Sequence, residues 1–95
     1  MKINQYNEKG EKEGWWEYYW RNVKIGSKGN YVNGKQEGLW EYYRSDGKLD
    51  WKGNFVNGKK EGLWKEYHSN RRLWFKGNYV NGIRHGKWEY YKKGE

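Results

Sequence analysis

Cysteine and proline are absent from this sequence, and methionine occurs once. Without cysteine, no disulfide can cross-link the chain, and zinc sites built on thiolates are excluded. Aliphatic side chains are scarce: hydrophobic residues make up 34% of the chain, and aromatic residues alone account for 21%. No apolar run is long enough for a signal peptide or a membrane span. We therefore expect a soluble, cytoplasmic protein without a transmembrane segment.

The chain has 95 residues and a net charge of +8, which predicts one domain over residues 1–95. Few aliphatic residues combined with high net charge is typical of disorder. The 8 Trp and 10 Tyr residues argue against disorder, because each large ring can bury about 150–250 Å². The sequence therefore predicts a core built from aromatic rings.

A motif of the form Gly-x-x-x-Gly-x-Trp occurs four times at a constant spacing of 24 residues. Its copies begin at residues 10, 34, 58 and 82 and end at Trp16, Trp40, Trp64 and Trp88. A fixed period of this length indicates a stacked repeat, in which each unit buries its apolar surface against its neighbours.

Each repeat reads as a β-hairpin. Two aromatic and β-branched runs are separated by Ser45-Asp46-Gly47 and closed by Asn57-Gly58, which are turn signals because Gly and Asn tolerate positive φ. The fold class predicted is all-β: a single elongated antiparallel meander of about eight strands, built from four 24-residue hairpins. Residues 2–9 fill the place of a degenerate N-terminal strand.

Side-chain alternation predicts which residues share a face in the second strand of each hairpin. One face of this strand in the clearest repeat carries Leu49, Trp51, Gly53 and Phe55. The first strand carries rings on both faces, with Trp40 and Tyr42 on one and Tyr43 on the other. The sequence leaves open which of these faces is buried.

The stretch from Trp51 to Gly62, with aromatic residues at 51 and 55 and glycines at 53, 58 and 62, resembles the membrane occupation and recognition nexus (MORN) repeat. The same pattern recurs from Lys28 to Gly38 and from Phe75 to Gly86. The four Trp residues stand where a second glycine is usual, and the unit is one residue longer, so the chain looks like the bacterial variant class. The resemblance implies a non-catalytic scaffold for protein docking, oligomer assembly or lipid contact, and many proteins of this class are labelled antitoxins of deaminase-type toxins.

Equivalent residues of successive repeats lie two strands apart, at roughly 9–10 Å. Two basic rows and an amide row are predicted on one face: Lys28, Lys52 and Lys76; Lys24, Lys48 and Arg72; and Asn30, Asn54 and Asn78. Such rows can hold phosphates, with aromatic rings as stacking surfaces for bases. The alternative is a solvated face that keeps the sheet soluble and resists edge pairing. The exposed rings expected as further contacts are Tyr43, Tyr67 and Tyr91.

An acidic row is formed by Glu13, Glu37 and Glu61, but rungs this far apart cannot converge on a metal ion. We expect these carboxylates to pair with turn lysines such as Lys35, Lys59 and Lys60. No arrangement of nucleophile, base and orienting group stands out, so neither enzymatic activity nor a cofactor is predicted.

The leading hypothesis is a non-enzymatic binding module that captures an anionic partner, either nucleic acid, nucleotide or an acidic protein surface, through its basic and aromatic rows. The alternatives are an antitoxin or immunity protein that blocks a toxin by direct contact, and a self-assembling structural module. A single sheet also lacks a second layer over its rings. Either the sheet curls on itself or a second copy covers it, and we expect a homodimer.

Overall fold

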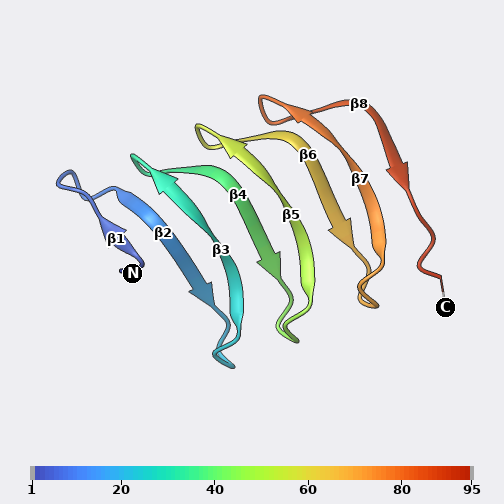
Figure 1. Ribbon diagram of the computed structural model, residues 1–95, viewed down its shortest axis with the longest axis horizontal. Helices are drawn as coiled ribbons and strands as arrows, with labels where there is room; N and C mark the ends of the chain where they lie inside the picture. Colours follow the sequence, from blue (N-terminus) through green and yellow to red (C-terminus); the bar gives the residue numbers. More distant parts are fainter. Residues whose placement is uncertain (1, 95) are drawn as a thin grey trace.

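The computed structural model describes residues 2–94. Its eight strands are β1 (Gln5–Tyr6), β2 (Lys12–Tyr19), β3 (Ile25–Val32), β4 (Lys35–Tyr43), β5 (Leu49–Val56), β6 (Lys59–Tyr67), β7 (Leu73–Val80) and β8 (Ile83–Tyr90). Each strand pairs only with its neighbours in the chain, so the sheet order is the chain order (Figure 1). The predicted all-β antiparallel meander is confirmed. Nothing in the described range is a helix long and apolar enough to cross a membrane.

The sheet is one layer, with extents of 48 × 34 × 18 Å. The first and last strands lie at opposite ends of the long axis (Figure 1). The N-terminal segment contributes a strand of only two residues, β1, which pairs with the start of β2, where Tyr6 lies opposite Lys12. A short first strand limits the open sheet edge that another chain could use for pairing.

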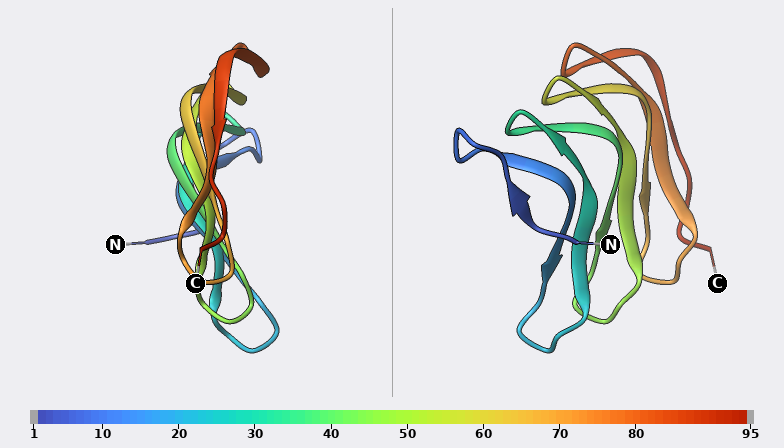
Figure 2. Two further views of the ribbon diagram at one scale, coloured as in Figure 1. Left: turned by 90° about the vertical axis from the view of Figure 1, so that its right-hand side faces the viewer. Right: turned by 60° about the vertical axis from the view of Figure 1, so that its left-hand side comes forward.

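Every hairpin is bent, as Figure 2 shows. The bend falls where the first strand of a hairpin has more residues than the stretch of the preceding strand that it faces. Lys28 of β3 lies opposite Glu41 of β4, and Asn30 lies opposite Glu37. The one residue between Lys28 and Asn30 therefore faces three residues of β4, 38–40. The extra residues include Gly38, whose φ of 77° lies in the left-handed region that glycine adopts without strain. The second glycine of each motif is therefore the bend glycine.

The repeated Trp fills the inside of this bend. The indole of Trp40 lies over Gly29 of the preceding strand, where a Cβ would come within 3.0 Å of the ring. Its Nε1 donates to the backbone oxygen of Asn30 at 2.9 Å, and Trp64 donates to Asn54 in the same way at 3.0 Å. The ring thus satisfies a carbonyl beside the interrupted ladder. The buried hydrophobic residues in the described range are Trp16, Trp40, Phe55 and Trp64, of which Trp40 is fully buried.

The register assigns the face that the sequence left open. Trp40 lies opposite Gly53, and Tyr42 lies opposite Trp51, and residues directly opposite in an antiparallel ladder share a face. We call this side the aromatic face: its rings are Tyr6, Trp16, Tyr18, Tyr31, Trp40, Tyr42, Trp51, Phe55, Trp64, Phe75, Tyr79, Trp88 and Tyr90.

The predicted position of Leu49 on that face is wrong. Tyr42 pairs with Trp51 but Tyr43 pairs with Leu49, so Asp50 is an extra residue in a β-bulge. A bulge of one residue reverses the alternation beyond it. Leu49 therefore lies on the side of Tyr43, opposite to the aromatic face.

The turns at the end of the sheet beyond the bulges tie successive repeats together. Arg44 donates to the backbone oxygen of Tyr67 at 2.8 Å, and Asn22 donates to that of Ser45 at 2.8 Å. The third residue of the turn adopts positive φ in the first three repeats, at Gly47 with 89° but also at Val23 with 61° and Arg71 with 73°. A β-branched residue such as Val23 is strained in this region.

Candidate functional site

The side opposite the aromatic face carries a row of charges along the middle of the strands. Opposing partners in the register link this row across seven strands: Glu17, Lys28, Glu41, Lys52, Lys65, Lys76 and Glu89. We call this side the charged face. The three lysines of the predicted ladder thus share one face with the exposed Asn30, Asn54 and Asn78, as the alternation indicated.

The rungs of this ladder are not equivalent. Lys28 forms a salt bridge with Glu41 at 3.9 Å, and Lys76 forms one with Glu89 at 3.8 Å. Lys52 also lies beside Glu41, but its partner on the other side is Lys65. Neither Lys52 nor Lys65 has a salt bridge within the described part of the chain.

The second basic row lies elsewhere. Lys24, Lys48 and Arg72 precede the strands and belong to the turns, so their prediction as a ladder on the same face is wrong. The bulge at Asp50 and its equivalents separates them from the ladder. The ammonium of Lys48 donates to the backbone oxygen of Ser69 at 3.0 Å, so this side chain ties neighbouring turns together.

The three tyrosines predicted as exposed contacts differ from one another. Tyr43 and Tyr67 are half-buried, and only Tyr91 is exposed, at 39%. The ammonium of Lys28 lies 5.5 Å from the ring centre of Tyr43. Burial raises the pKa of Tyr43, as does the nearby Glu41 carboxylate. Among these rings, Tyr91 alone offers the open surface that the sequence suggested.

The carboxylates of the predicted acidic row form hydrogen bonds with the Asn-Gly turns. Glu37 accepts a hydrogen bond from the backbone N–H of Asn57 at 2.8 Å, and Glu61 accepts one from Asn81 at 2.9 Å. Neither carboxylate pairs with a lysine within residues 2–94, so the expected ion pairs with the turn lysines are wrong. Each carboxylate instead fixes the Asn-Gly turn of the next repeat. No group of three or more acidic or His side chains in the described range converges as a metal site would.

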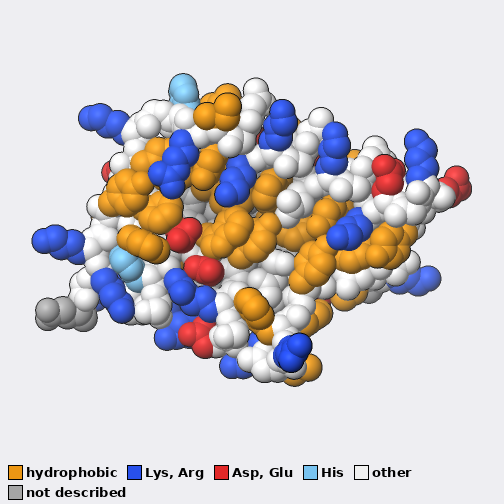
Figure 3. Space-filling view, turned by 180° about the vertical axis from the view of Figure 1, so that it is seen from behind, with side chains coloured by type: hydrophobic (Ala, Val, Ile, Leu, Met, Phe, Trp, Pro, Cys, Tyr) orange, Lys and Arg blue, Asp and Glu red, His pale blue; other side chains and the backbone are white. Residues whose placement is uncertain are grey.

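The aromatic face carries its own cations, which the sequence reasoning missed. Figure 3 shows hydrophobic side chains gathered across this side, with Lys and Arg side chains lying over them. Lys12, Lys60 and Arg84 occupy equivalent positions of three repeats. The ammonium of Lys60 lies 4.8 Å from the ring centre of Trp64 and 4.9 Å from that of Trp51. Cations over ring faces are attracted by the ring quadrupole.

In three repeats the residue at this position donates to the hydroxyl of the tyrosine six residues later. Lys12 donates to Tyr18 at 2.7 Å and Gln36 donates to Tyr42 at 2.8 Å. Arg84 donates to Tyr90 at 2.9 Å. The third repeat has the donor, Lys60, but no tyrosine at position 66.

The third repeat departs from the others at two adjacent positions. The sequence after the motif Trp is Glu-Tyr-Tyr in the first, second and fourth repeats but Lys65-Glu66-Tyr67 in the third. Consecutive strand residues point to opposite faces. Lys65 therefore changes the charged face, and Glu66 changes the aromatic face. Aligning the four repeats with one another would have revealed both.

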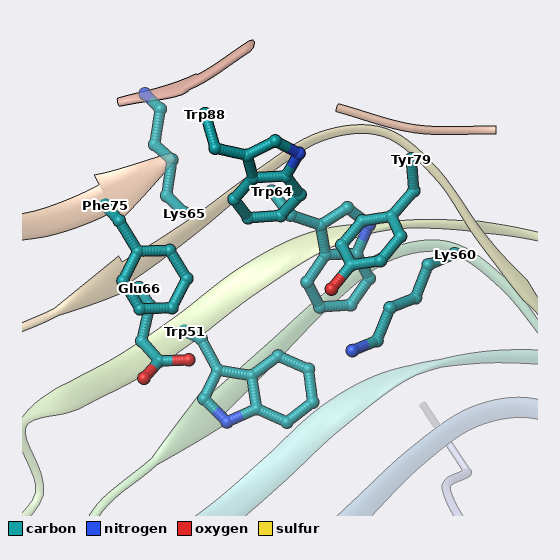
Figure 4. Close-up of a pocket in the computed structure, with 8 residues that line it drawn as sticks. All are labelled: Trp51, Lys60, Trp64, Lys65, Glu66, Phe75, Tyr79 and Trp88. Atoms are coloured by element: carbon teal, nitrogen blue, oxygen red, sulfur yellow. The ribbon is translucent and has the colours of Figure 1, made fainter. Parts of the chain in front are cut away.

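A pocket of about 230 Å³ opens on the aromatic face beside Glu66. Figure 4 shows the residues that line it: Trp51, Lys60, Trp64, Lys65, Glu66, Phe75, Tyr79 and Trp88. The side chain of Lys65 points away from the rings. Burial raises the pKa of Glu66, and the nearby Asp50 carboxylate raises it further, against the opposing effects of Arg44, Lys60 and Arg84. The surroundings of Glu66 thus disfavour its charged form, and the other repeats have a tyrosine at this position.

A second hollow of about 260 Å³ lies near the other end of this face, where Ser27 stands in place of the rings of Trp51 and Phe75. Its lining includes Tyr18 and Tyr42, whose hydroxyls already accept hydrogen bonds from Lys12 and Gln36. This hollow therefore lacks the unused donor that distinguishes the first.

No known protein family, curated protein or solved structure matches this chain. Its likeness to the MORN repeat therefore rests on the motif in the sequence.

Proposed function

We propose that this protein is a non-enzymatic binding module that captures a phosphate-bearing partner, a single-stranded nucleic acid, on its charged face. The observation that carries the proposal is that position 65 is a lysine, whereas the equivalent position of the other three repeats is a glutamate. Three neighbouring strands present Lys52, Lys65 and Lys76 directly opposite one another, and only Lys76 forms a salt bridge within the described residues.

Like charges directly opposite one another in a sheet lower its stability. A glutamate at position 65, as at 17, 41 and 89, would relieve the repulsion. A substitution that breaks a local rule without a structural gain is a mark of function. A row of phosphates would supply the missing negative charge, which is the usual role of lysines in nucleic-acid binding.

The surface beside this cluster is suited to a chain of phosphates. A shallow hollow of about 180 Å³ is lined by Leu39, Lys52, Gly53, Asn54, Leu63 and Lys65. Asn54 is exposed beside Lys52, and its amide adds a hydrogen-bond donor for phosphate oxygens. Most of the aromatic rings lie on the opposite face, so the proposed contact relies on phosphates rather than on base stacking.

The test is the anisotropy of a labelled 12-nucleotide oligothymidylate, titrated with the protein at several salt concentrations. Three phosphate contacts predict that log affinity falls by roughly two units per unit of log salt. Lys65→Glu restores the repeat pattern, so we expect it to fold, to lose most of the binding and to flatten the salt slope. Lys92→Glu makes the same charge change on the exposed C-terminal segment and is the matched control.

Two results of these titrations would overturn the proposal: no binding by the parent protein at physiological salt, or equal weakening by Lys65→Glu and Lys92→Glu. The first would leave the lysines as a device for solubility, and the second would mean that net charge alone drives binding. Polyglutamate of similar length serves as a second probe. If it binds as tightly as the oligonucleotide, the partner is an acidic protein surface and the nucleic-acid assignment is wrong.

A further inference from the structure

The aromatic face holds a vacancy for one ring at Glu66. This residue lies opposite Trp51 on one side and opposite Phe75 on the other. In the preceding repeat, Tyr42 stacks on Trp51 with ring centres 3.7 Å apart and planes 11° apart. In the following repeat, Tyr90 packs on Phe75 with ring centres 5.2 Å apart. A tyrosine at position 66 would therefore lie between Trp51 and Phe75.

The hydrogen-bond donor for that absent ring is in place. Lys12, Gln36 and Arg84 each donate to a tyrosine hydroxyl of their own repeat. Lys60 is held over the rings of Trp51, Trp64 and Tyr79. Its ammonium donates no hydrogen bond to any residue between 2 and 94. The first, second and fourth repeats thus each combine a hydrogen-bond donor with a tyrosine hydroxyl. The third repeat has the donor but lacks the hydroxylated ring.

From this arrangement we infer that the pocket at Glu66 binds a hydroxylated aromatic ring supplied from outside the chain. The ring would lie between Trp51 and Phe75, with its oxygen accepting a hydrogen bond from Lys60. The volume of about 230 Å³ is sufficient, since an apolar cavity of about 150 Å³ can hold benzene. The Glu66 carboxylate lines the same pocket (Figure 4) and can accept a hydrogen bond from a donor on the ligand.

The probes are p-cresol and toluene, which reproduce the side chains of tyrosine and phenylalanine and differ by one hydroxyl group. The readout is the indole N–H signals of Trp64, Trp88 and Trp20 in NMR titrations of the full chain. A hydrogen bond to a charged group predicts that p-cresol binds about tenfold tighter than toluene. Shifts should appear at Trp64 and Trp88 and not at Trp20, which lines the hollow near Ser27.

Variants at two positions separate the parts of the inference. Glu66→Tyr restores the repeat, so we expect it to fold and to lose p-cresol binding. Lys60→Met keeps the aliphatic stem and should remove the preference for p-cresol over toluene. Lys60→Gln introduces the neutral donor found at Gln36 and should keep a preference for p-cresol, but a smaller one. A Glu66→Tyr variant that still binds p-cresol, equal affinity of the parent for both probes, or shifts confined to Trp20 would each overturn the inference.

The ring has two sources, which a further arm distinguishes. A capped Gly-Tyr-Gly peptide that binds tighter than p-cresol would identify a tyrosine side chain of another protein. Tighter binding of p-cresol would identify a small phenol. If neither binds at millimolar concentration, the inference is wrong. Lys65 borders both the pocket and the proposed phosphate contact, but the two proposals are tested with different probes and different variants, so they can fail independently.

Discussion

Gly53 lies directly beneath the indole ring of Trp64. A Cβ at Gly53 would come within 3.0 Å of three atoms of that ring, a distance that packed carbon atoms do not tolerate. The ring in turn is only 4% exposed and donates to the backbone of the next residue, Asn54, at 3.0 Å. The glycine and the tryptophan therefore form one unit, repeated as Gly29 with Trp40 and Gly77 with Trp88.

Replacing this glycine should destabilise the protein strongly. Gly53→Ala forces the indole out of its position, and overpacking of this kind costs about 1–3 kcal/mol; Gly53→Val should cost more. The control is Gly26→Ala, because a Cβ there meets its nearest neighbour at 3.4 Å. Urea unfolding followed by fluorescence measures both. Equal stability of Gly53→Ala and the parent would show that the ring does not lie on the glycine.

The buried tryptophans should contribute unequally along the stack. Trp40 is 1% exposed and its Nε1 has an acceptor, so Trp40→Ala should cost about 3–5 kcal/mol. Trp88 lies on the last strand, is half-buried, and its Nε1 has no partner within residues 2–94. Trp88→Ala should therefore cost clearly less. Thermal unfolding of the two variants gives the comparison, and a larger loss for Trp88→Ala would contradict it.

Relief of backbone strain at Val23 should stabilise the protein. Val23 has a φ of 61° and is 82% exposed, so its side chain gains little from packing. The second repeat has Gly47 at this turn position. We expect Val23→Gly to raise the free energy of unfolding by up to about 1 kcal/mol. The control, Val32→Gly, removes an exposed strand residue and should lower it by about 0.5–1 kcal/mol. A loss of stability in Val23→Gly would refute the strain.

The raised pKa of Glu66 predicts a change of stability with pH. Its cause is first burial and then the Asp50 carboxylate. Because the folded state holds this proton more tightly than the unfolded state, stability rises as the pH falls through the raised pKa toward the ordinary value of 4.5. Above the raised pKa the penalty is fully present, and Glu66→Gln should remove it.

The measurement is the difference in unfolding free energy between the parent and Glu66→Gln as a function of pH. The variant should be the more stable one near neutral pH, and its advantage should shrink toward pH 4.5. Carboxylates that do not interact with Glu66 cancel in this difference, including Glu17, whose pKa is lowered by hydrogen bonds from Tyr19 and Trp15. A constant difference across this range would show that Glu66 has an ordinary pKa.

The sequence predicted the hairpins because each turn has its own chemical signal, such as Asn57-Gly58, and the period repeats it. It left the buried face of the first strand open because Trp40 and Tyr43 offer rings to both sides. The deciding partner is a glycine on another strand, Gly53, which only the register brings opposite Trp40. The bulge at Asp50 has no distinctive residue, so the reversal of Leu49 was not visible.

For the candidate sites too, the sequence predicted the face of a residue but not its neighbours on the adjacent strands. Alternation along one strand placed Lys28, Lys52 and Lys76 on one face, as the structure has them. Alternation says nothing about the strand alongside, so the salt bridge from Lys28 to Glu41 and the opposition of Lys52 to Lys65 were missed. Both depend on cross-strand register, which the turn lengths and bulges set together.

The strands lie side by side in chain order, from β1 at one end of the sheet to β8 at the other, and this order has a mechanical consequence. Since β1 and β8 lie at opposite ends of the long axis (Figure 1), a force that separates the chain ends acts along the inter-strand hydrogen bonds. The bonds next to the pulled end bear the force one at a time, whereas each inner ladder shares it among several bonds, so the ladders open from the ends of the sheet inward. A tether built on this protein would therefore extend at low force, one hairpin at a time, and shorten again as hairpins re-form on the remaining sheet.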